Sequence, residues 1–170
     1  MRWMRERLAK DEGFTLIELM VVVLIIAVLV AIAIPSFLGF RARAQDRSAQ
    51  ADLRNVLLSE KAEWTDNGAF TETEATLKSF EPSVEINTTS SATAGVFVDM
   101  SVASNNDVVC LTQSSASGNF FAMFEDGSAT GGTFYGASTA DITCPTSAGA
   151  PATSASVTWS ETGFPAATVP

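Results

Sequence analysis

The chain has 170 residues, of which 46% are hydrophobic, and a formal net charge of −9. This length accommodates one compact domain together with one membrane-length segment. The chain has no lysine or arginine after Lys78, so its C-terminal half lacks the basic surface that nucleic acids require. We therefore expect no direct binding of nucleic acid.

The N-terminal region combines a basic stretch with an apolar run. Residues 1–13 form a short charged segment, with basic side chains at Arg2, Arg5, Arg7 and Lys10. The uncharged run Leu19–Phe40 follows, and it would span roughly 33 Å as a helix, enough for the core of a bilayer. By the positive-inside rule the N-terminus is expected in the cytoplasm, although Arg41, Arg43 and Arg47 follow the run and weaken that argument.

Helical periodicity continues beyond the apolar run. Apolar residues fall on one stripe of the continuing helix: Ala42, Ala49, Leu53, Val56, Leu57 and Trp64. The pattern predicts one long helix from Phe14 to Thr65, ended by the stop signal Asp66-Asn67-Gly68. Pro35 removes a hydrogen bond to the preceding turn, so we expect a kink or a locally loosened helix there.

The remainder of the chain predicts a polar head with a small sheet. Residues 68–95 are expected to connect the helix to three or four antiparallel strands. Alternation over residues 96–102 is typical of a half-buried strand, and further strand patterns cover 107–113, 120–125, 132–136 and 156–160. The predicted fold class is α+β, with a long N-terminal helix, half membrane-spanning and half amphipathic, packed on the sheet.

Five aromatic residues and an acidic pair stand out in the strand region. Alternating strands bury half of their side chains, so we assign the aromatic residues mainly to the core: Phe120, Phe121, Phe124, Phe134 and Tyr135. Glu125 and Asp126 precede Gly127, and this position predicts the tip of a turn rather than a catalytic pair.

The two cysteines, Cys110 and Cys144, both lie in the polar half. Disulfides persist in exported domains, so we predict a Cys110–Cys144 bridge. Closing a loop of about 35 residues would stabilise the fold by roughly 3–4 kcal/mol. Two buried, reduced thiols are the alternative.

A single carboxylate, Glu18, lies almost at the start of the apolar run. Its charge costs about 2.5 kcal/mol or more at a bilayer centre and less near the interface. The spacing from Thr15 to Glu18 is that of a capping box, and a negative charge in the first turn suits the helix dipole. No A-x-A cleavage site follows the run. Cleavage after Gly13 would give Phe14 a free amine one turn from Glu18. The Glu18 carboxylate would then have a partner, either the amine of its own chain or that of the next chain.

The sequence GFTLIELMVVVLIIAVLVAIAIP, residues 13–35, closely resembles the class III leader and N-terminal segment of type IV pilins and pseudopilins. The resemblance implies that a prepilin peptidase cuts after Gly13 and that the new N-terminus, Phe14, is methylated. It implies that Glu18 neutralises the Phe14 amine of a neighbouring subunit. Pro35 would lie where the helix loosens in an assembled filament.

The resemblance also implies an organisation and a partner set. Residues 1–13 would be the removed leader, 14–40 the transmembrane and assembly helix, 41–66 the amphipathic helix and 67–170 the exported head. The helix would hold the chain in the cytoplasmic membrane, surrounded by lipid. An inner-membrane platform with a cytoplasmic ATPase would then assemble copies of the chain into a helical filament on the cell surface.

The function implied is that of a structural subunit of a type IV pilus, which serves adhesion, twitching motility or DNA uptake. The alternative is a major pseudopilin of a type II secretion system. Such proteins often hold calcium in an acidic C-terminal loop, and no D-x-D spacing is present here. A minor pilin is a third option. Because the chain has no histidine and no phosphate-binding glycine loop, we expect no enzyme activity, no metal and no cofactor.

Overall fold

The computed structural model describes residues 13–88, 95–100, 107–128, 131–145, 149, 151 and 157–167. The chain divides into two compact units, Met1–Arg41 and Ala42–Pro170. The predicted leader lies outside the described residues, apart from its last residue, Gly13.

One helix, α1 (Leu16–Asn67), contributes to both units. Its bounds differ by two residues at each end from those that the periodicity predicts. The predicted stop signal is confirmed, because Gly68 has a positive φ of 71° and its N–H donates to the Trp64 carbonyl oxygen at 2.8 Å. Glycine at this position closes a helix without the strain that a Cβ atom would cause.

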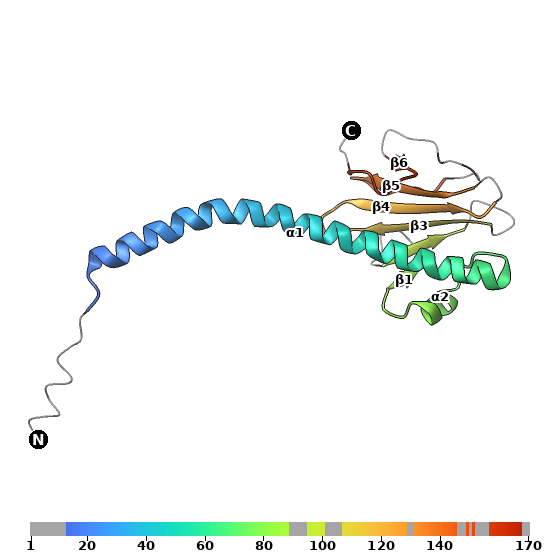
Figure 1. The fold of residues 1–170 in the computed structure, drawn as a ribbon, viewed down its shortest axis with the longest axis horizontal. Coiled ribbons are helices and arrows are strands. Elements are labelled where there is room, and N and C mark those ends of the chain that lie inside the picture. The colour runs from blue at the N-terminus through green and yellow to red at the C-terminus, as the bar shows by residue number, and fades with distance from the viewer. Residues whose placement is uncertain are drawn as a thin grey trace, which may run out of the picture. The chain divides into compact units, whose positions relative to one another are not determined.

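The second unit contains a six-stranded sheet whose strands follow one another in chain order (Figure 1). The strands are β1 (Ile86–Asn87), β2 (Val96–Asp99), β3 (Val108–Ser114), β4 (Phe120–Asp126), β5 (Thr133–Ser138) and β6 (Thr158–Ser160). Neighbours from β2 to β6 pair antiparallel, whereas β1 pairs parallel with β2. The predicted antiparallel sheet is confirmed, but it has more strands than expected.

The connection between α1 and the sheet carries two elements that the sequence did not predict, α2 (Glu74–Phe80) and β1. A strand of two residues is too short to show a period of two, and α2 is barely two turns long. The prediction of a plain connecting segment is therefore wrong.

One face of the sheet packs against the amphipathic half of α1 (Figure 1). The predicted stripe is buried at Ala49, Leu53, Val56 and Leu57, whereas Ala42 and Trp64 at its ends are only partly buried. These side chains share one core with residues of the inner strands, among them Val98, Leu111, Phe121 and Met123. The helix contributes side chains with a period of 3.6 residues to one side of this core, and the strands contribute side chains with a period of two residues to the other side.

The C-terminal part of the chain covers the other face of the central strands. Val108, Cys110 and Phe124 pack there with Phe134, Cys144 and Trp159. Both faces of β3 and β4 are therefore buried, whereas β2 is half-buried, as its alternation predicts. Phe121 and Phe124 are almost fully buried, which agrees with the core assignment of the aromatic residues.

The predicted disulfide is confirmed. Cys110 of β3 is bonded to Cys144, which follows β5, and their Cα atoms lie 6.0 Å apart. The bridge holds the C-terminal covering segment against the middle of the sheet.

Candidate assembly site

No described residue of its own unit covers the apolar part of α1. The large apolar side chains from Leu16 to Phe40 are exposed, from 44% for Val30 to 75% for Leu16. Within the described residues, one helix is long and apolar enough to cross a membrane. An 18-residue stretch of this helix has a mean hydropathy of 3.3 and contains no buried residue. A helix that is apolar on every side requires lipid or other apolar helices around it.

Glu18 lies in the first turn of this helix and forms the predicted capping box. The Glu18 N–H donates to the Thr15 hydroxyl oxygen at 3.2 Å, and Glu18 Oε2 accepts from the Thr15 N–H at 3.3 Å. The Thr15 hydroxyl lies 3.1 Å from the same Oε2. The helix begins here in a chain that still contains Gly13, so cleavage is not needed to start it.

The capping box uses only one of the two carboxylate oxygens. Glu18 Oε2 makes all the hydrogen bonds of the carboxylate with other described residues, so Oε1 is left without a partner among them. The charge itself is not neutralised by a cation in the part of the chain that the structure describes. Glu18 is therefore oriented by its own helix and retains the capacity to accept from a further donor.

Gly13 and Phe14 precede the helix and are exposed. The Phe14 side chain is 86% exposed, and the position of a Cβ on Gly13 has no neighbouring atom within 4 Å. Pro35 lies inside α1, which is assigned as one helix across it. The roles of these three residues in processing and assembly stay predictions.

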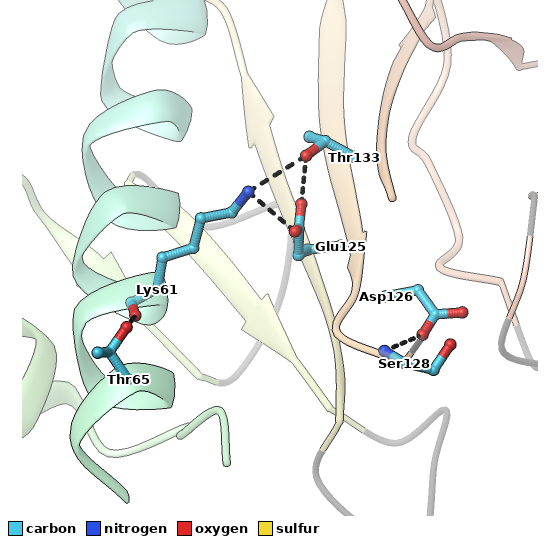
Figure 2. Close-up of polar contacts among 6 residues, drawn as sticks. All are labelled: Lys61, Thr65, Glu125, Asp126, Ser128 and Thr133. Carbon is cyan, nitrogen blue, oxygen red and sulfur yellow. Dashed lines mark hydrogen bonds and ion pairs between the residues drawn. The ribbon is translucent and has the colours of Figure 1, made fainter. Parts of the chain in front are cut away.

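The acidic pair of the head is not at a turn tip, contrary to the prediction. Glu125 and Asp126 are the last residues of β4, and both are buried. Figure 2 shows Lys61 of α1 reaching Glu125, with a distance of 2.8 Å between Lys61 Nζ and Glu125 Oε1. The Thr133 hydroxyl accepts from Lys61 Nζ and donates to Glu125 Oε2. Pairing with β3 includes both residues and pairing with β5 includes Glu125, which is why the strand extends into this pair.

Asp126 holds the loops beyond the strand. Its Oδ1 accepts from the Ser128 N–H at 2.9 Å, and its Oδ2 accepts from the Gly149 N–H at 2.8 Å. Burial alone would raise the pKa of Asp126, but hydrogen bonds from the Ser128 side chain and from these two N–H groups hold that pKa below its ordinary value. The acidic pair thus connects β4 to α1 and to Ser128 and Gly149.

Glu60 is a further buried acid that sequence reasoning missed. Its side chain is fully buried, Oε2 accepts from the Thr71 N–H at 3.0 Å, and Oε1 has no hydrogen-bond partner. Burial, with smaller contributions from Glu63 and Glu72, raises the pKa of Glu60 from 4.5 to about 8. The sequence does contain a signal for the burial of Glu60, since position 60 lies on the same helix face as Leu53, Val56 and Leu57.

Within the described ranges, no group of three or more histidine, cysteine, aspartate or glutamate side chains is arranged to hold a metal ion. The features that the structure brings together for a binding role are instead the bare apolar helix and its capped carboxylate. An exposed apolar helix is thus continued by an amphipathic helix on a disulfide-bonded sheet, which is the arrangement expected from the resemblance to pilins.

Comparison with known proteins agrees with this class. The prokaryotic N-terminal methylation motif matches residues 8–34. The type IV major pilin protein PilA of Myxococcus xanthus is 40% identical over 63 residues, which are 37% of this chain and 29% of the relative. The type IV wide pilus major component PilA4 of Thermus thermophilus is 41% identical over 66 residues, 39% of this chain and 50% of the relative.

The chain thus spans half or less of the length of these two relatives. The family motif falls on the exposed apolar part of α1 and on the residues that precede it. The N-terminal part of the chain is therefore similar to the N-terminal segment of type IV pilins, and both relatives are named as major components of their pili.

Proposed function

We propose that this chain is a major structural subunit of a type IV pilus. The observation that carries the proposal is the uncovered apolar helix with its single, locally capped carboxylate. Lipid covers such a helix before assembly, and copies of the same helix cover it afterwards. The transfer exchanges one apolar surrounding for another, so its free-energy cost is modest.

In this proposal, peptidase cleavage after Gly13 creates a methylated amine on Phe14. The Glu18 carboxylate then accepts that amine from a neighbouring subunit through Oε1, which the capping box leaves unused. A charge-assisted hydrogen bond of this kind is strong in an apolar surrounding. It gives each incoming subunit a defined axial position.

The partners and location follow from the same proposal. The chain spans the cytoplasmic membrane once, with its N-terminus inside, until a membrane platform and a cytoplasmic ATPase assemble it into the surface filament. The names of the relatives support a pilus over a type II secretion pseudopilus, because both are pilus components. The division at residues 13, 40 and 66 belongs to this proposal.

The test is intact mass measurement of the chain in filaments sheared from the cell surface. The proposal predicts a chain that begins at methylated Phe14 and retains the Cys110–Cys144 bond. A chain that begins at Met1 and stays in the membrane fraction would contradict it and would leave a plain membrane anchor.

A further inference from the structure

The arginines of the second unit differ from its lysines in their partners. Lys61 pairs with Glu125 at 2.8 Å, and Lys78 pairs with Glu74 at 2.7 Å. No arginine pairs with a carboxylate among the described residues of this unit. Arg47 donates to the Gln50 amide oxygen, Arg54 lies over the Phe164 ring, and Arg43 makes no polar contact there.

Two of these arginines line a groove at one end of the head. The groove has a volume of about 380 Å³ and lies between the start of the amphipathic helix, the β3–β4 turn and the C-terminal segment. Arg43, Arg47 and Asn119 are among its lining residues. Asp46 also lines it, but its two oxygens already accept from Ser117 and Asn119. We call this the basic end.

The opposite end of the head carries carboxylates without partners. Asp66 lies in the last turn of α1, and Asp107 directly precedes β3. The Gly127 N–H donates to the Asp107 carbonyl at 2.8 Å, and a Cβ on Gly127 would lie 2.9 Å from the Trp64 ring, so these segments meet. Neither carboxylate contacts a cation in the described part of the chain. We call this the acidic end.

The helix dipole gives the acidic end an independent preference for a cation. The last turn of α1 contains no basic residue but does contain Glu63 and Asp66. The C-terminus of a helix carries a partial negative charge, and carboxylates there are unfavourable while cations are favourable. The described part of the chain supplies no cation at this position, whereas the basic end supplies two arginines without acidic partners among the described residues.

We propose that the basic end of one copy docks on the acidic end of a second copy, with Arg43 and Arg47 facing Asp66 and Asp107. The inference rests on the proposed pilus function. The contact is heterologous, so its repetition produces an open filament. Arg43 and Asp66 are separated by roughly 35 Å along α1, so the contact joins copies shifted by about that distance along the helix.

The chemistry of the pair fits this contact. Guanidinium groups bind carboxylates through two parallel hydrogen bonds, which adds geometric specificity to the charge attraction. Like charges brought together at an interface repel each other, so the same arrangement disfavours a copy docked in the reverse direction. Charge complementarity therefore sets the polarity of the stack of heads.

Charge reversal in full-length chains tests the contact. Arg43→Glu with Arg47→Glu, and separately Asp66→Lys with Asp107→Lys, should each lower the yield of sheared filaments by about tenfold or more. A chain with all four substitutions should recover to within about twofold of the wild type, because the contact is restored with exchanged signs. Glu161→Lys is the control, since Glu161 is exposed and makes no polar contact with its side chain in the described residues.

Intact mass of the membrane pool checks that each variant has been processed and has formed its disulfide. Reversed pairs that assemble like the wild type would overturn the contact, as would a four-substitution chain that stays defective. Absence of filaments in the wild type would instead overturn the proposed function on which the contact rests.

Discussion

Among single residues, Glu60 combines complete burial with only one hydrogen bond. The Thr71 N–H fixes one carboxyl oxygen, and the other lies in the core of the head without a partner. Burial raises the pKa of this group to about 8, so the folded chain holds its proton at neutral pH. The unfolded chain releases that proton near the ordinary value of 4.5.

This difference predicts a pH-dependent stability. Because the folded chain binds more protons, its free energy of unfolding falls as the pH rises from 4.5 to about 8. Glu60→Gln keeps an acceptor for Thr71 and removes the titration, so its stability should vary less over this range. Urea unfolding of the full chain in detergent, followed by tryptophan fluorescence, measures the effect. Glu161→Gln is the control, and a slope unchanged by Glu60→Gln would contradict the assignment.

The ion pair between Lys61 and Glu125 gives a second prediction for single residues. Glu125 is buried, so Lys61→Met leaves its charge without a cation and should lower the free energy of unfolding by about 1–3 kcal/mol. Lys78→Met is the matched control, because its partner Glu74 is half-exposed and such helical pairs contribute only about 0.3–0.5 kcal/mol. Equal urea midpoints for the two variants would show that burial does not strengthen the Lys61 pair.

At this scale the sequence predicted the residues whose roles depend on local spacing. The Thr15–Glu18 capping box is set within one helical turn, so three residues of separation suffice to predict it. The partners of Lys61 and Asp46 lie more than 60 residues away in the sequence. Those pairings depend on the register of the sheet under α1, which no local pattern contains.

At the scale of elements, the long helix and the central strands were predicted because their patterns extend over many residues. The short elements β1 and α2 depend on tertiary contacts and were missed. The burial of both faces of β3 and β4 was also missed, because the covering C-terminal segment has no regular periodicity. The turn assigned to Glu125 and Asp126 was wrong because pairing with β3, and with β5 as far as Glu125, extends the strand.

The disulfide gives a prediction at the scale of elements. It joins β3 to the segment that covers the second face of the sheet, with 34 residues of sequence separation. Cys110→Ala with Cys144→Ala should lower the free energy of unfolding by about 3–4 kcal/mol, because the unfolded chain regains the freedom of that loop. Urea unfolding of the full chain in detergent measures it. Wild-type protein treated with reductant should unfold at a similar midpoint, and an unchanged midpoint in the variant would contradict the estimate.

At the scale of the whole molecule, the two units have different requirements. The unit from residue 42 onward buries most of its described large apolar side chains in its own core. The described large apolar side chains of the N-terminal unit are exposed and require lipid or other copies around them. The proposed filament would satisfy the second requirement, and the proposed contact between the basic and acidic ends would give that filament a direction.

The central claim concerns Glu18, which caps its own helix and for which we propose an intersubunit role as well. The two roles separate by substitution, because glutamine serves in a capping box as glutamate does but has no charge. Thr15→Ala removes the hydroxyl that caps the helix and leaves the charge of Glu18 in place; loss of such a cap costs about 0.5–2 kcal/mol.

The most direct measurement is therefore the yield and intact mass of sheared filaments from wild type, Glu18→Gln and Thr15→Ala. The account predicts that Glu18→Gln is cleaved to Phe14 but is absent from filaments, whereas Thr15→Ala still assembles. Normal assembly of Glu18→Gln, together with loss of filaments in Thr15→Ala, would show that Glu18 acts only as a helix cap and would contradict the intersubunit contact.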